Sequence, residues 1–181
     1  MEKDGVRRLM GDMAPIDPGV GLLVTSSLFV WLSRRLPGTA AAYVAMRDEV
    51  DVANLFDRLP GWRWVLPRVE GDRSLTFRDR DVPREVHEWG MEQPVDRGEV
   101  VPISQLDVIL VPGVAFDRSG ARLGRGAGYY DRVLSERRSD STAVGVTVEE
   151  RVLGSVPVAD HDEVVDLLAT ESGVRECSPR S

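Results

Sequence analysis

The residues best suited to chemistry gather in a glycine-rich segment, residues 120–128. Arg122 and Arg125 carry planar, permanently charged guanidinium groups that match the oxygen atoms of a phosphate. Glycines let the backbone turn tightly and bring its N–H groups close to an anion. The segment matches neither the dinucleotide fingerprint nor the P-loop. It predicts a phosphate-binding loop, with an ordinary structural turn as the alternative. The glycines are Gly120, Gly124, Gly126 and Gly128.

Two regular elements are expected to position this loop. The apolar run at residues 109–111 is typical of a strand buried on both faces, which we expect over residues 107–111. A helix is expected from Tyr129 to Arg137, with its positive N-terminal end beside the loop. Because parallel sheets bind ligands beyond the carboxyl ends of their strands, we expect the loop to lie at that edge.

The rest of the chain alternates helical patterns with apolar strand patterns, which is typical of an α/β fold. Such alternation predicts a mostly parallel sheet covered on both faces. Residues 79–105 are polar and rich in proline and glycine, so we expect a long loop anchored by Trp89. We expect helices over residues 21–35 and 50–59, and strands over residues 40–46, 62–69, 75–78, 143–148 and 164–169.

Composition narrows the class of protein. A chain of 181 residues suits a single domain, residues 1–181, with a weakly ordered segment at 1–19 and a polar tail at 173–181. The net charge of −7 argues against a nucleic-acid partner. The most apolar stretch is too short to span a bilayer, so we expect no membrane partner. One cysteine, Cys177, fits a reducing compartment. We therefore expect a cytoplasmic protein, and we expect a monomer.

The segment from Val111 to Arg132, VPGVAFDRSGARLGRGAGYYDR, closely resembles the signature of the 5-formyltetrahydrofolate cyclo-ligase family. Weaker resemblances lie at residues 42–51 and 66–69 and in the closing block VPVADHDEVVDLLATESGV. The resemblance implies a three-layer α/β/α sandwich. It also implies conversion of 5-formyltetrahydrofolate to 5,10-methenyltetrahydrofolate with ATP and Mg²⁺, releasing ADP and phosphate. The implied intermediate is a phosphorylated formyl group, an iminium phosphate.

The resemblance also implies roles for individual residues. Arg122 and Arg125 match positions that stabilise the transferring phosphoryl group, so both are candidate catalytic residues. The candidate metal ligands are Asp131 and Asp162. The candidate ATP-binding residues are Lys3, Arg7, Arg122, Leu123, Gly124, Arg125, Gly126, Ala127, Gly128, Tyr129 and Tyr130. The candidate folate-binding residues are Val44, Glu49, Arg125, Gly126, Ala127, Gly128 and Tyr129.

Structural alternatives stay open for several of these residues. In the alternative interpretation, Asp131 stabilises the first turn of a helix, Asp162 lies in a solvated turn, and Glu49 lies in a surface turn. In the same interpretation, the side chains of Val44 and Tyr130 pack in the hydrophobic core. The two histidines, His87 and His161, are too few to suggest zinc, and we expect structural or solvent roles for them.

The sequence departs from the family pattern at three places, and the first two of them favour a second hypothesis. Ala127 stands where many members have lysine, Gly11–Pro15 replaces part of a basic helix, and Val148 and Arg151 replace an aromatic residue and a glutamine. The second hypothesis is a non-catalytic or repurposed relative that binds a folate or a nucleotide. A third is a different phosphoryl-transfer enzyme on a similar scaffold.

Overall fold

An eight-stranded sheet in the order β13-β12-β10-β7-β1-β2-β3-β6 forms the centre of the computed structural model, which describes residues 3, 5, 8, 10, 14–72, 74–88 and 90–178. The four pairings between β12 and β2 are parallel, and the strands beyond them at both edges pair antiparallel. This confirms the expected mostly parallel sheet. The strands are β1 (Thr39–Ala41), β2 (Arg63–Val69), β3 (Leu75–Asp79), β6 (Val100–Val101), β7 (Val108–Pro112), β10 (Thr142–Val146), β12 (Leu167–Thr170) and β13 (Gly173–Glu176).

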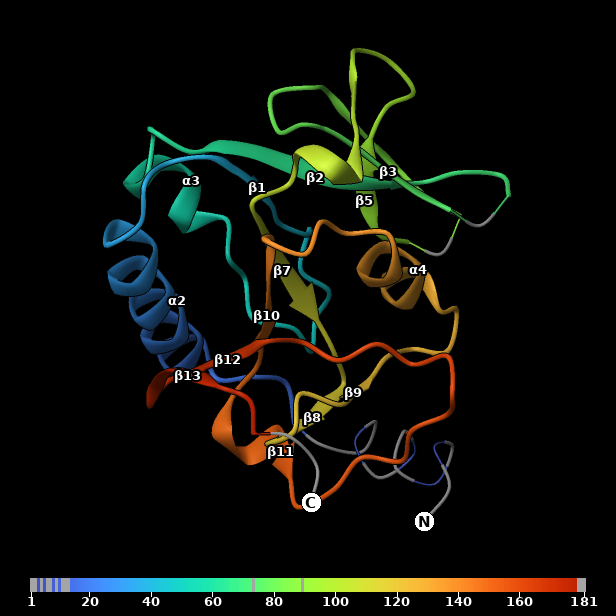
Figure 1. The fold of residues 1–181 in the computed structure, drawn as a ribbon. Helices are drawn as coiled ribbons and strands as arrows, with labels where there is room; N and C mark the ends of the chain where they lie inside the picture. Colours follow the sequence, from blue (N-terminus) through green and yellow to red (C-terminus); the bar gives the residue numbers. More distant parts are fainter. Residues whose placement is uncertain are drawn as a thin grey trace.

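Helices cover both faces of the sheet, which confirms the three-layer α/β/α architecture (Figure 1). Helices α2 (Pro18–Ser33) and α3 (Asn54–Arg58) lie on one face, and α4 (Tyr129–Ser135) lies on the other. Side chains of a strand alternate between the faces. Val108 and Leu110 of β7 therefore pack in the core under α2, while Ile109 and Val111 pack under α4.

Helix α2 begins three residues before the expected residue 21. Pro18 occupies its first turn, where a missing N–H has no cost, and the Asp17 carboxylate accepts a hydrogen bond from the Val20 N–H at 3.1 Å. None of the described helices is long and apolar enough to cross a membrane.

Several expected boundaries are wrong. The strand expected at 40–46 is the shorter β1, and the helix expected at 50–59 is the shorter α3. The last parallel strand, β12, begins at Leu167 rather than at residue 164. The expected polar tail at 173–181 opens with strand β13, which pairs antiparallel with β12. Gly173, at φ 126°, allows the tight turn between them. Edge strands like β13 carry little apolar signal because their stability comes from pairing.

Residues 79–105 are not the irregular loop that we expected. They form a two-stranded ribbon of β4 (Arg84–Val86) and β5 (Glu92–Pro94), the edge strand β6 and the 3₁₀ turn η1 (Ile103–Gln105). The expected anchor, Trp89, lies outside the described residues. Short strands with polar residues are set by cross-strand partners that a local pattern does not contain.

A small second sheet interrupts the predicted glycine-rich loop. Strand β8 (Ala115–Asp117) pairs antiparallel with β9 (Arg122–Leu123) and parallel with β11 (Val152–Leu153), which follows the 3₁₀ turn η2 (Glu149–Arg151). The β8–β9 turn is built around the buried Asp117, whose Oδ1 accepts from the Ser119 N–H at 2.9 Å and whose Oδ2 accepts from the Val156 N–H at 2.8 Å. The turn places Arg122 at a defined position.

Substitution of Gly120 tests how closely this turn packs against the rest of the protein. Its φ is +84°, and a Cβ there would lie 2.2 Å from the Val165 carbonyl oxygen. We expect Gly120→Ala to lower the free energy of unfolding by about 2–4 kcal/mol because strain and overpacking add. Gly154→Ala is the control, since a Cβ there meets nothing within 4 Å. Denaturant unfolding measures both variants, and equal stabilities would contradict this account.

Candidate functional site

A cavity of about 540 Å³ opens where β1, β2 and β7 end. Tyr43 and Val44 follow β1, Val69 closes β2, and Gly113 follows β7, so the cavity lies at the carboxyl edge of the parallel strands, as expected. Its size is typical of a small-molecule site.

Every described candidate residue lines this one cavity. Arg7 lies outside the described residues, so its predicted role has no structural test. The candidates that line the cavity are Lys3, Val44, Glu49, Arg122, Leu123, Gly124, Arg125, Gly126, Ala127, Gly128, Tyr129, Tyr130, Asp131 and Asp162.

Each glycine of the signature has a different structural role. Gly120 does not line the cavity, so its expected place beside a ligand is wrong. Gly124 leaves room for Arg122, because a Cβ there would lie 2.4 Å from Arg122 Nη1. Gly126 and Gly128 adopt left-handed φ values of 104° and 69°, which favour glycine. The loop therefore turns beside the cavity with little side-chain bulk.

Arg122 is the most enclosed cation of the site. Its side chain is 6% exposed, and its Nη2 donates to both oxygens of Asp131, at 3.1 and 3.0 Å. Its guanidinium carbon lies 5.7 Å from the centre of the Tyr130 ring, which is a cation–π distance. Asp131 also accepts from the Glu163 N–H at 3.4 Å. The Asp131 carboxylate thus faces the cavity and its arginine.

A second cation–carboxylate pair lines the same cavity. Lys3 donates to Asp162, which also accepts from the Ala159 N–H at 2.6 Å. Burial alone would raise the pKa of Asp162, but the hydrogen bonds from Lys3 and Ala159 outweigh it and lower that pKa. Asp162 is therefore ionised at neutral pH and held in place, rather than lying in a freely solvated turn.

Glu49 also lines the cavity, in a closed turn. Its Oε2 accepts from the Met46 N–H at 3.0 Å, and its Oε1 lies 3.5 Å from Arg125 Nε. Arg125 also forms an ion pair with Asp48. The Glu49 side chain is only 10% exposed, and burial raises its pKa despite the hydrogen bond from Met46 and the charge of Arg125. It is not the surface residue of the alternative interpretation.

Two buried polar atoms at the cavity have no hydrogen-bond partner in the described part of the chain. They are the Tyr130 hydroxyl and Arg122 Nε. Burial and the nearby Glu49 raise the pKa of Tyr130 well above its usual value, so the hydroxyl keeps its proton and can donate. Both atoms therefore have hydrogen-bonding capacity that the described part of the chain does not use.

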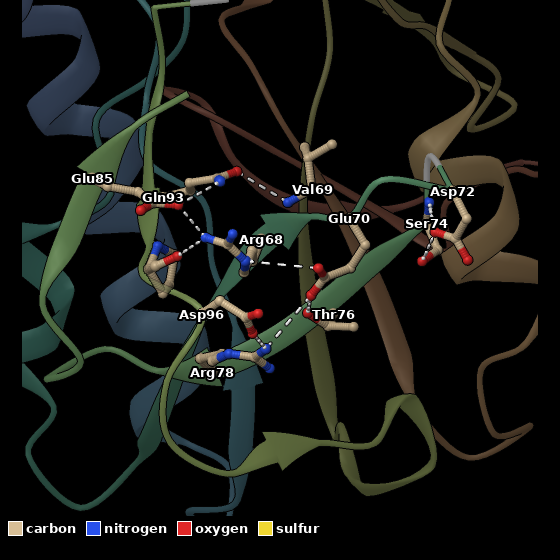
Figure 2. Close-up of polar contacts among 11 residues, drawn as sticks. Arg68, Val69, Glu70, Asp72, Ser74, Thr76, Arg78, Glu85, Gln93 and Asp96 are labelled. Atoms are coloured by element: carbon tan, nitrogen blue, oxygen red, sulfur yellow. Dashed lines mark hydrogen bonds and ion pairs between the residues drawn. The ribbon is translucent and has the colours of Figure 1, made fainter. Parts of the chain in front are cut away.

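An apolar part of the cavity wall comes from β2, β3 and the residue that precedes β5. Pro67, Val69, Leu75 and Met91 line the cavity there. Figure 2 shows the polar network behind this wall: the buried Gln93 accepts from the Val69 N–H at 3.1 Å. Arg68 donates to Glu85 and to the Pro94 carbonyl, the latter at 2.7 Å. The network fixes the β4–β5 ribbon against β2.

Sequence reasoning missed several cavity residues. The ribbon residues Met91 and Gln93 lie in the expected loop, so no local signal marked them. Asp48 does not line the cavity but pairs with Arg125, and it was detectable as the neighbour of Glu49. His161 lines the cavity beside Asp162, with Nε2 3.9 Å from Oδ1, although its side chain is 81% exposed.

Asp131 and Asp162, the predicted metal ligands, both line the cavity. Within the described residues, no group of three or more histidine, cysteine or acidic side chains is arranged to hold a metal. Asp131 and Asp162 supply two carboxylates at one cavity, and Mg²⁺ is usually held by one or two carboxylates together with water and phosphate oxygens.

The model of the 5-formyltetrahydrofolate cyclo-ligase family matches residues 34–171. The chain is 36% identical over 143 residues to the 5-formyltetrahydrofolate cyclo-ligase of Mycolicibacterium smegmatis, covering 73% of this chain and 74% of the relative. It is 35% identical over 162 residues to the mouse (Mus musculus) enzyme of that name, and the match covers 80% of this chain and 79% of the mouse enzyme.

Solved structures agree with this assignment. The fold matches the solution structure of Aquifex aeolicus 5,10-methenyltetrahydrofolate synthetase with a TM-score of 0.80 and 30% identity, covering all of this chain and 96% of that one. The synthetase of Mycoplasma pneumoniae, at 23% identity and a TM-score of 0.78, shares the fold. The sequence resemblance is therefore confirmed: the chain belongs to the 5-formyltetrahydrofolate cyclo-ligase family, a family of ligases.

Proposed function

We propose that this protein converts 5-formyltetrahydrofolate to 5,10-methenyltetrahydrofolate with ATP and Mg²⁺, releasing ADP and phosphate. One observation carries the proposal. Two cation–carboxylate pairs, Arg122 with Asp131 and Lys3 with Asp162, line the same cavity as the enclosed carboxylate of Glu49. This arrangement supports a polyanion site beside a site for a ring with N–H donors.

The part of the cavity lined by the pairs Arg122–Asp131 and Lys3–Asp162, which we call the phosphate end, would bind the nucleotide. Binding would replace each ion pair with new contacts to phosphate and metal. Arg122 and Lys3 each pair with a carboxylate, and phosphate oxygens would compete for the same cations. Asp131 and Asp162, once released, would hold Mg²⁺, which when bound offsets the negative charge of the phosphates. The loop from Leu123 to Gly128 would contribute backbone N–H groups, and Arg7, Tyr129 and Tyr130 are proposed to complete this end.

The folate end would be organised by Glu49. A pterin presents neighbouring N–H groups, and a carboxylate can accept from both. Val44 and the apolar wall at Pro67, Val69 and Leu75 would pack against the flat ring. The loop residues 125–129 lie between the two ends and would contact both substrates, with Arg125 beside Glu49.

In the proposed reaction the formyl oxygen attacks the γ-phosphorus, and the bond from that phosphorus to the bridging oxygen of ADP breaks. The product is an iminium phosphate. The second folate nitrogen then attacks the formyl carbon and loses its proton, and the carbon–oxygen bond breaks to release phosphate. Arg122 and Arg125 would stabilise charge on the transferring phosphoryl group, and the cavity aligns the reactants.

We also propose that the enzyme acts as a cytoplasmic monomer of one domain on small-molecule substrates, without a nucleic-acid or membrane partner. The net charge of −7 and the single cysteine support this setting.

The direct test is a spectrophotometric assay with 5-formyltetrahydrofolate, Mg²⁺ and ATP. We expect the near-ultraviolet absorbance of the methenyl product to grow only when ATP is present. Absence of product from folded protein that still binds both ligands in titrations would instead support the non-catalytic relative.

Asp131→Asn tests the metal role. The change keeps an acceptor for Arg122 but removes the charge, so we expect kcat to fall about 100-fold and half-maximal activity to need more Mg²⁺. The control is Asp140→Asn, because Asp140 lies outside the cavity with a 75% exposed side chain. Wild-type turnover at all Mg²⁺ concentrations in Asp131→Asn would remove Asp131 from the metal site.

Glu49→Gln tests the folate contact through pH. Glu49 accepts from both ring N–H groups only when it is ionised, and burial raises its pKa above the ordinary value of about 4.3. We therefore expect the wild-type KM for 5-formyltetrahydrofolate to increase as pH falls through that raised pKa.

In Glu49→Gln we expect the KM for 5-formyltetrahydrofolate at neutral pH to be about 10- to 100-fold higher than in the wild type. This KM should no longer increase as the pH falls, and the KM for ATP should change by a smaller factor. Glu99→Gln, whose side chain is 74% exposed, is the control. Equal changes in both KM values would argue against a pterin contact.

A further inference from the structure

The β4–β5 ribbon supplies part of the cavity wall although it forms a sheet of its own. Gln93 of β5 and Met91 just before it line the cavity. Backbone pairing joins β4 only to β5, so side chains must hold the ribbon against the central sheet. Just after β5, Arg78 of β3 donates to Asp96 at 2.7 Å and ties down the end of the ribbon. The contacts that hold the ribbon itself come from β2.

One of these contacts lies where β2 continues past the end of β1. β1 pairs with residues 63–65 of β2, whereas β2 continues to Val69. The Val69 N–H donates to Gln93 Oε1 at 3.1 Å, so a side-chain amide satisfies a backbone donor in the stretch that β1 does not reach. Because an N–H can only donate, this contact fixes the orientation of the amide, with its oxygen towards β2.

Arg68 holds the same amide through Glu85. The Gln93 Nε2 donates to Glu85 Oε1 at 3.4 Å, and Arg68 donates to that same oxygen and to the Pro94 carbonyl (Figure 2). The hydrogen bond from Arg68 lowers the pKa of Glu85, which is therefore ionised at neutral pH. Arg68 thus joins both strands of the ribbon to β2, and its own side chain is 14% exposed.

Arg68 acts on the cavity without lining it. Its neighbours Pro67 and Val69 line the cavity, and because side chains of a strand alternate between the faces, Arg68 lies on the other face of β2. Its guanidinium reaches the cavity wall only through the ribbon. The fork of donors on a rigid plane suits this task, since one group can hold a carboxylate and a carbonyl at once.

We propose that Arg68 is a positioning residue for the folate end of the cavity, because it clamps the β4–β5 ribbon onto β2 and so fixes Gln93 in the wall. The inference rests on the proposed function, which assigns folate to the part of the cavity lined by Glu49 and the apolar wall. Loss of Arg68 leaves Glu85 without its cation and Gln93 with a poorly held amide. The wall beside the folate ring then becomes less well defined, while the phosphate end keeps its own contacts.

The test measures the Kd of 5-formyltetrahydrofolate and, separately, the Kd of a non-hydrolysable ATP analogue with Mg²⁺. Arg68→Met keeps an unbranched chain but removes every donor, so we expect the Kd for folate to rise about three- to tenfold, the effect of losing one hydrogen bond. The Kd for the analogue should not change. Arg68→Lys keeps the charge and can reach one partner at a time, so it should restore part of the folate affinity.

Gln93→Met shows whether Arg68 acts through Gln93. This variant removes the acceptor of the Val69 N–H and should also weaken folate binding. Independent effects multiply, whereas effects that share one route do not. The double variant Arg68→Met with Gln93→Met should therefore bind folate no more weakly than the weaker of the two single variants.

Arg137→Met is the matched control. Arg137 has a similarly enclosed side chain, 19% exposed, and it pairs with Asp166 away from the cavity. Its loss should lower stability and leave both Kd values unchanged, which separates positioning from general destabilisation. If Arg68→Met does not fold, Arg68→Lys decides by the same measurement, with a smaller rise in the Kd for folate.

Three results overturn the inference: a wild-type Kd for folate in the Arg68 variants, equal changes in the Kd values of folate and the ATP analogue, or multiplied effects in the double variant. Wild-type protein that binds no folate or forms no ATP-dependent product would instead contradict the proposed function, so the two failures are distinguishable.

Discussion

The enclosed ion pair between Arg122 and Asp131 is the contact on which the rest of the site depends. A buried charge without a partner costs several kcal/mol, so a 6% exposed guanidinium requires a carboxylate within reach. The first turn of α4 supplies that carboxylate, and this joins α4 to β9. Glycines at 113 and 124 are part of the same constraint, because a Cβ at either position would lie 3.1 Å or less from Arg122.

Pairing of cations with carboxylates also organises the cavity of this acidic protein. Lys3 and Arg122 carry positive charge, while Asp131 and Asp162 hold them in place and offset that charge. The same carboxylates suit a divalent cation. Glu49 and Arg125 form a further cation–carboxylate pair at the same cavity.

Local pattern was sufficient for the centre of the fold and for the signature loop. The apolar run at 109–111 predicts a buried parallel strand because β7 is covered on both faces, and β7 lies there with its side chains divided between two cores. The ribbon at 84–94 and strand β13 escaped prediction because short polar strands depend on pairing. The Asp117 turn gave Gly120 a packing role that looked like a ligand role.

The amino-acid sequence alone determined the α/β architecture and the residue types of the signature, because these follow from periodicity, glycine content and charge within short windows. Only the tertiary structure decided which charges meet. Lys3 and Asp162 are 159 positions apart, and Arg151 reaches carbonyls 103 and 137 positions away. Contacts at such separations depend on how the layers pack and on which groups lose water when they do, and no local pattern contains that information.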